Sequence, residues 1–245
     1  MDAQAPDRPA TARSALVETV RAVAAVSAAA ALLGVLVGGV GGRLAMALLA
    51  ATNPEDTGRL TDDGFSIGQL TLGGTVQLLG TALQLGLVAG LIYLALRPLT
   101  LGPGWLRVAE ITVGGTVTFA ALLIHPGIDF TDLDPDWLPV ALFLAIPAVF
   151  LVSLCLLAER WLAPGSWFAT APTGRVAVVL AVWALSGPLV LLLAVALGVG
   201  VGWRRLGGTT RPSARAGVRW ALRGVLGLIG VWALVELAAD LDTVL

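Results

Sequence analysis

The sequence predicts an all-α integral membrane protein, built as a bundle of about six transmembrane helices. Apolar residues make up 57% of the 245 residues and charged residues only 13%, about half the charge of a typical soluble domain. Mean hydropathy is +0.89. The apolar residues also fall into six stretches, each long enough to cross about 30 Å of hydrocarbon as a helix. The lipid bilayer is therefore the expected surrounding of this chain.

The six stretches are expected to be helical because a backbone in lipid must satisfy its own hydrogen bonds. Their expected ranges are 22–42, 72–96, 108–124, 140–160, 176–202 and 220–238, within a single transmembrane domain of residues 1–245, and residues 1–15 are expected to form a flexible tail. The first stretch is too long for the apolar part of a cleavable signal peptide. It therefore counts as a span.

The arginines of the connections predict the orientation, because loops that stay in the cytoplasm are enriched in positive charge. The N-terminal tail and the connections 97–107 and 160–175 carry arginines. The connections 53–71 and 125–139 are instead dominated by carboxylates. We therefore expect a multi-pass protein of the plasma membrane with its N-terminus in the cytoplasm.

The fifth stretch conflicts with this charge pattern. A single span over 176–202 places the arginines of 204–223 outside the cell. A re-entrant hairpin that turns at Gly187-Pro188 places them inside, but each of its halves is short for a span. Because proline is tolerated in membrane helices, we favour a single kinked span. The hairpin, and with it the side of the C-terminus, stays open.

Several function classes are excluded or disfavoured by composition. A net charge of −1 provides no basic surface for nucleic acid. One histidine and one cysteine, Cys155, argue against haem, iron–sulfur and zinc sites. No nucleotide-binding or hydrolase motif is present. We expect no cofactor, no metal site and no catalytic residue, although cation binding by the outer aspartates stays open.

Glycines recur at helical spacing in the first two stretches. Gly34, Gly38 and Gly42 are each four residues apart, and so are Gly86 and Gly90. Small residues at this spacing allow two membrane helices to approach closely. The pattern predicts helix packing, within one molecule in the interpretation we prefer, or across a homo-oligomer.

Arg43 directly follows the first stretch, in the longer low-polarity run Ala22–Thr52, where a guanidinium costs several kcal/mol unless it pairs or reaches the interface. As a structural residue it would pair with Asp62 or Asp63 in the following loop. As a functional residue it would bind an anion such as a phosphate or a carboxylate. We favour the structural role and keep these three residues as the candidate ligand site.

Polar residues at helical spacing mark one face of the second stretch and one face of the third. These residues are Gln77, Thr81 and Gln84 on the second stretch, and Glu110, Thr118 and His125 on the third. If the faces meet, they could line a path for a proton or a small solute. Hydrogen bonding between helices is the structural alternative.

Three motifs occur in the first half of the chain, GGRLAM at Gly41–Met46, TDDGF at Thr61–Phe65 and TLGGT at Thr71–Thr75. This pattern resembles a group of multi-pass membrane proteins from high-GC Gram-positive bacteria. The resemblance covers roughly the first 100 residues. It implies a bacterial multi-pass topology and no particular mechanism.

The sequence thus favours a non-enzymatic membrane protein with a structural, assembly or regulatory role. A transporter or channel for small solutes or protons is one alternative, which a hydrated cavity between the second and third helices would support. A membrane enzyme acting on a lipid or phosphate-bearing substrate is the other, which convergence of Arg43 and Asp62 would support. Substrate, partner and oligomeric state do not follow from the sequence.

Overall fold

The computed structural model describes residues 11–60, 67–124, 133–206 and 212–244. It is 87% helical, and no strand occurs within those ranges. Six helical segments are long and apolar enough to cross a membrane. The predicted all-α bundle is therefore confirmed.

The first segment is a continuous helix of 41 residues, Ala12–Thr52. It consists of α1 (Ala12–Leu33), the π-helical segment η1 (Gly34–Val40) and α2 (Gly41–Thr52). Thr11 caps its start by accepting a hydrogen bond from the backbone N of Ser14. Such a cap satisfies one of the free N–H groups of a helix terminus, so the helix begins earlier than predicted and includes residues 12–15 of the expected tail.

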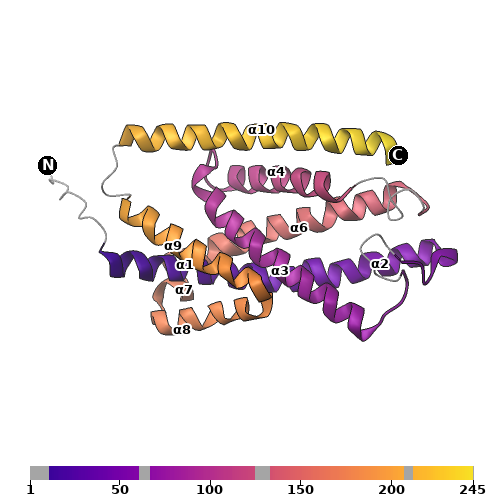
Figure 1. The fold of residues 1–245 in the computed structure, drawn as a ribbon, viewed down its shortest axis with the longest axis horizontal. Helices are drawn as coiled ribbons and strands as arrows, with labels where there is room; N and C mark the ends of the chain where they lie inside the picture. The colour runs from indigo at the N-terminus through magenta and orange to yellow at the C-terminus, as the bar shows by residue number, and fades with distance from the viewer. Residues whose placement is uncertain (1–10, 61–66, 125–132, 207–211, 245) are drawn as a thin grey trace.

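Several of the other helices pack against this first one. They are η2 (Pro54–Asp56), α3 (Leu72–Leu96), η3 (Arg97–Leu99), α4 (Trp105–Leu123), α6 (Trp137–Leu162), α7 (Trp167–Thr170), α8 (Thr173–Val178), η4 (Val179–Leu189), α9 (Val190–Leu206) and α10 (Pro212–Val244). α3 packs across α1 and η1, and α6 also contacts α1. α10 runs along one side of the bundle, with α4 between it and α6 (Figure 1).

The fifth apolar segment, formed by α8, η4 and α9, turns back on itself. Gly187 has φ 57° and ψ −130°, which breaks the helix at that residue. Glycine adopts such a positive φ at little cost because it has no Cβ. In Figure 1, α8 and α9 run in opposite directions on the two sides of this turn.

Both ends of this hairpin attach to one turn of α1. Arg21 donates hydrogen bonds to the carbonyl oxygens of Ala169 and Ala171, just before α8. At the other end, Arg204 of α9 forms an ion pair with Glu18 at 2.5 Å. The two arms therefore start and finish at the same level of the bundle.

The tip of the hairpin lies midway along the length of the bundle. Near the tip, the indole Nε1 of fully buried Trp183 donates to the hydroxyl of Ser27 at 2.9 Å. Trp183 also packs with Leu83 and Leu87, halfway along α3. The structure thus has the hairpin, not the single kinked span that we favoured, because each arm has its own contacts with α1.

The bundle has two chemically different ends. We call the end at which α1 begins the basic end; its described charges are Arg13, Arg21, Arg97, Arg107, Arg160, Arg175, Arg204, Arg205, Arg219 and Arg223, with Glu18, Glu110 and Glu159. We call the other end the acidic end; its described charges are Glu55, Asp56, Asp134, Asp136, Glu236, Asp240 and Asp242, with Arg43 and Arg59. The hairpin produces this separation, since it returns the chain to the basic end before α10.

Candidate functional site

Arg43 is the predicted ligand residue that lies beside a cavity. Its Nη2 lies 3.0 Å from the position that a Cβ on Gly74, in the first turn of α3, would occupy. Its Nε and Nη2 atoms are buried and find no hydrogen-bond partner within the described ranges, and its Nη1 lies 3.9 Å from the sulfur of Met46. The cavity measures about 130 Å³ and is lined by Arg43, Met46, Ala47, Ala50, Gly68, Gln69 and Leu70.

The carboxylates proposed as partners of Arg43 cannot be placed beside it. Asp62 and Asp63 lie outside the described residues. The described ion pair of this loop joins Arg59 to Asp56 at 3.2 Å. Arg43 is therefore a cation whose neighbours in the described chain are mostly apolar.

The Asn53 side chain connects two elements of the acidic end by hydrogen bonds. Its side-chain nitrogen donates to the carbonyl oxygen of Leu49 at 3.0 Å, and its side-chain oxygen accepts from the backbone N of Asp134 at 2.7 Å. Asn53 is only 1% exposed, so both polar atoms of its side chain form hydrogen bonds in the protein interior. This amide links the end of α2 to the start of α6.

Gly34 and Gly86 form a close contact between the first two long helices. A Cβ on Gly34 would lie 2.5 Å from the carbonyl oxygen of Ala82, and a Cβ on Gly86 would lie 2.6 Å from that of Ala30. A Cβ on Gly90 would lie 2.7 Å from the Cβ of Ala30. These glycines therefore pack within one molecule, where they let two backbones touch.

The π-helical segment changes which further glycines face α3. A π-helix closes i to i+5 hydrogen bonds, so the spacing of an α-helix does not continue through it. A Cβ on Gly38 would lie 3.2 Å from Ala82, and one on Gly39 would lie 2.5 Å from the side chain of Leu79. At Gly42 the corresponding distance is 3.6 Å, an ordinary contact, so Gly39 takes the role predicted for Gly42.

The polar faces of the second and third stretches do not come together. α3 packs against α1, η1 and η4, whereas α4 packs against α6 and α10. Gln77 and Thr81 are exposed on the surface of α3, and Gln84 is half-buried. The described residues therefore do not form the predicted path between these helices.

The two described residues of the predicted polar face of α4 make hydrogen bonds within that helix or to the turn before it. The hydroxyl of Thr118 donates to the carbonyl oxygen of Gly114 at 2.7 Å. The carboxylate of Glu110 accepts from the backbone N of Leu101 at 2.9 Å and so closes the turn before α4. His125, the third residue of this predicted face, lies outside the described residues.

Glu159 is the centre of a hydrogen-bonded cluster that the sequence did not predict. Its Oε1 accepts from the hydroxyl of Tyr93 at 2.7 Å, from Nε of Arg97 at 2.7 Å and from Nη1 of Arg107 at 2.6 Å. Its Oε2 accepts from Nη2 of Arg97 at 2.9 Å. One carboxylate thus joins the end of α3, the start of α4 and the end of α6.

A signal for this cluster was present in the sequence. Arg97, Arg107 and Glu159 each lie at an end of a predicted helix, and the topology places these three ends on one side of the membrane. What the sequence could not supply was the rotation of each helix, which decides whether the three side chains face one another. Charge-assisted hydrogen bonds of this kind are roughly twice as strong as neutral ones.

Arg223 attaches α10 to the rest of the basic end. It donates to the carbonyl oxygens of Leu99 at 2.7 Å and Thr100 at 2.8 Å. Its guanidinium also lies 5.0 Å from the centre of the Trp220 ring. The two hydrogen bonds give the last helix a polar link to the end of η3, while the contact with Trp220 lies within α10.

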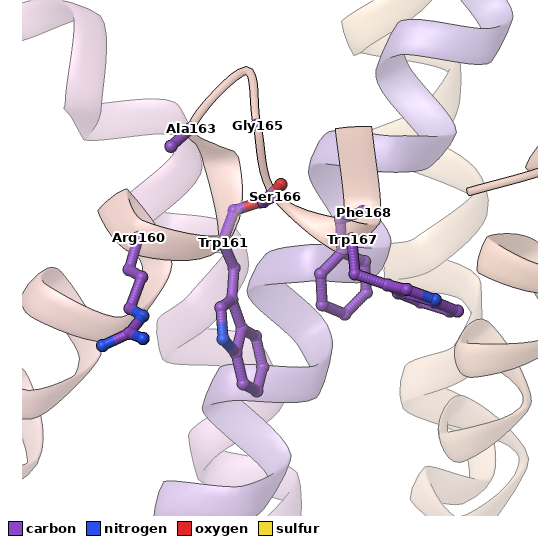
Figure 2. A pocket seen from close by; sticks show the side chains of 7 residues that line it. All are labelled: Arg160, Trp161, Ala163, Gly165, Ser166, Trp167 and Phe168. Carbon is purple, nitrogen blue, oxygen red and sulfur yellow. The ribbon is translucent and has the colours of Figure 1, made fainter. Parts of the chain in front are cut away.

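A second hollow, of about 420 Å³, opens at the basic end between α6 and α7 (Figure 2). Its lining residues are Arg160, Trp161, Ala163, Gly165, Ser166, Trp167 and Phe168. The Phe168 ring lies 5.3 Å from Trp161 and 5.1 Å from Trp167, measured between ring centres. Aromatic rings beside an arginine are typical of residues at the level of lipid headgroups.

The comparisons with known proteins add no relative, since no family model, no curated protein and no solved structure matches this chain. Within the described residues, no group of three histidine, cysteine or acidic side chains is placed to hold a metal ion. The aspartates of the loop before α6 lie only partly within those residues. Function is therefore inferred from the geometry of the bundle itself.

Proposed function

We propose that this chain is a non-enzymatic protein of a bacterial plasma membrane, with a structural, assembly or regulatory role. Five helical segments cross the bilayer, and the hairpin of α8, η4 and α9 enters from the cytoplasm and returns to it. The N-terminus lies in the cytoplasm and the C-terminus outside. The bacterial origin rests on the resemblance of the GGRLAM, TDDGF and TLGGT motifs.

One observation carries this topology. Both ends of the hairpin are bound to the same turn of α1, through Arg21 at one end and Glu18 at the other. All arginine-rich connections are then at the basic end, which agrees with the retention of positive loops in the cytoplasm. A single fifth span would instead divide them between the two sides.

Hydrogen bonds between the helices of the basic end support the structural role. Glu159 accepts four hydrogen bonds from side chains of α3, η3 and α4, and Arg223 binds the turn after η3. These contacts connect helices instead of projecting into a cavity. A bundle joined in this way suits a scaffold in the membrane.

Labelling of single cysteines tests the topology, in a background in which the buried Cys155 is replaced by alanine. Exposed Thr57, Ser213 and Thr243 are each changed to cysteine. We expect a membrane-impermeant maleimide to label positions 57 and 243 in intact cells, and position 213 only after permeabilisation. Labelling at 213 and protection at 243 in intact cells would instead establish a single fifth span.

Complementation of a deletion strain tests the functional class. We expect Gln84→Leu and Glu110→Gln to restore the phenotype of the wild-type gene, because neither side chain lies in a path through the bundle. Glu159→Gln should restore it only in proportion to the amount of protein in the membrane. A Glu110→Gln protein that is present at the normal level but does not complement would favour the transporter instead.

A further inference from the structure

The Arg43 side chain has hydrogen-bonding capacity that the described protein does not use. A guanidinium carries five N–H donors, and here Nε and Nη2 are buried without an acceptor. An unsatisfied buried donor loses its solvation without compensation, and the loss is larger for a charged group. Such a group in a folded protein calls for an explanation, of which a bound ion is one.

A second source of positive potential lies next to this guanidinium. The first turn of α3 lies beside Nη2 of Arg43, which is 3.0 Å from the position that a Cβ on Gly74 would occupy. The N-terminus of a helix carries a partial positive charge and free N–H groups. The hydroxyl of Thr71 accepts the hydrogen bond of only one of them, the backbone N of Gly74. A cation held against this end of a helix is unfavourable unless an anion joins them.

The cavity beside Arg43 has a suitable size and surrounding. At about 130 Å³ it has room for about four water molecules of roughly 30 Å³ each, which suits one tetrahedral oxyanion. Among the described residues that line it, Arg43 is the charged one and Gln69 adds an amide. Its lining residue Leu70 is 77% exposed, and Leu44, which follows Arg43 in the chain, is 67% exposed, so exposed apolar side chains suited to acyl chains lie close to this site.

We propose that Arg43 and this cavity bind a phosphate group, carried by a lipid headgroup or by a soluble phosphate. The guanidinium donates two parallel hydrogen bonds to two phosphate oxygens, the geometry for which arginine is suited. The amide of Gln69 supplies a further donor. This site goes beyond the scaffold role proposed above and is independent of the orientation of the chain.

Titration calorimetry on the full chain tests the proposal, in a maltoside detergent that contains no phosphate. One arm uses dioctanoyl phosphatidic acid, with dioctanoylglycerol as the lipid that lacks the phosphate. The other arm uses inorganic phosphate. Binding of the lipid alone identifies a headgroup site, and binding of inorganic phosphate identifies a site for soluble phosphate; either result supports the proposal.

Arg43→Gln is the decisive variant, because it keeps a polar side chain of similar length and removes the charge. We expect its Kd to rise by roughly tenfold to hundredfold, as for the loss of a charged hydrogen-bond donor. Arg205→Gln, at the exposed end of α9, is the control and should change the Kd by less than about twofold. Unchanged binding by Arg43→Gln, an equal loss in Arg205→Gln, or no binding in either arm overturns the proposal.

Two glycine variants keep the test decisive if Arg43→Gln does not fold. A Cβ on Gly74 would lie 3.0 Å from Nη2 of Arg43, whereas a Cβ on the adjacent Gly73 would meet nothing within 4 Å. Gly74→Ala should therefore weaken phosphate binding, and Gly73→Ala should not. Equal affinities in the two variants would contradict the site, and neither result affects the cysteine labelling that tests the topology.

Discussion

The arginines that join helices at the basic end and Arg43 at the acidic end use their hydrogen-bond donors in opposite ways. At the basic end, Arg97 and Arg107 share the carboxylate of Glu159, and Arg21 and Arg223 each donate to two backbone carbonyl oxygens. At the acidic end, Arg43 is held against the first turn of α3, with buried nitrogens that no described group satisfies. Arginine thus joins helices at the basic end, whereas at the acidic end Arg59 pairs with Asp56 and Arg43 stays available for a ligand.

This difference shows what a guanidinium needs in order to be structural. At the basic end, three helix ends and two turns meet, so Arg97, Arg107 and Arg223 find acceptors in other elements, and Arg21 finds them for two of its three nitrogens. Arg43 has mainly small and apolar neighbours at the acidic end. A charged group without an internal partner destabilises a fold, so its position is better explained by binding than by stability.

Removal of the Glu159 charge should have the largest effect on stability. Glu159→Gln leaves Arg97 and Arg107 without a counter-charge, and we expect the free energy of unfolding in detergent to fall by about 2 kcal/mol. This value lies between those of exposed and buried ion pairs, because the Glu159 side chain is 32% exposed. Titration with SDS measures it. Glu236→Gln, on an exposed position of α10, is the control, and an equal loss there would contradict the expectation.

Loss of the Arg223 contacts should have a smaller effect, confined to the last helix. Arg223→Gln removes two hydrogen bonds to the turn after η3, and we expect a loss of about 1 kcal/mol. Faster hydrogen exchange at the start of α10, followed by mass spectrometry, should accompany it. Arg219→Gln changes an exposed arginine one turn earlier and is the control. Equal losses of stability and equal hydrogen exchange in the two variants would show that the hydrogen bonds of Arg223 do not attach α10 to the bundle.

Arg43→Gln should have the smallest effect in the absence of phosphate. Because this change removes an unpaired charge, we expect the free energy of unfolding to stay within about 0.5 kcal/mol of the wild type or to rise. The same SDS titration in phosphate-free detergent measures it. A loss as large as that of Glu159→Gln would show that Arg43 is a structural residue after all and would remove the contrast between the two ends.

Helix positions were the part of the fold that the sequence predicted best. The expected ranges 72–96, 108–124 and 140–160 differ by at most three residues from α3, α4 and α6, because apolar composition alone marks a segment in lipid. The sixth helix is longer than predicted, since α10 continues at both ends through residues that carry charges. Length and composition could not distinguish a span from a hairpin, because both contain the same number of apolar residues.

The candidate site was predicted only in part, for a related reason. Arg43 stood out as a charge in an apolar helix, and in the structure it lies beside a cavity; that it binds a ligand stays a prediction. The Glu159 cluster was missed because its members lie in three helices whose rotations depend on packing. The faces of Gln77 and Glu110 were predicted from helical spacing, which says nothing about the neighbouring helix that each face meets.

The hairpin has a consequence for how the chain enters the bilayer during synthesis. Its apolar length is sufficient for the translocon to treat it as an ordinary span, yet its finished form has both ends at one surface. α1 leaves the ribosome first, and it already carries the hydroxyl of Ser27 that Trp183 binds and the carboxylate of Glu18 that Arg204 pairs with. The groups that bind both arms of the hairpin are therefore already present in the nascent chain before the hairpin is synthesised.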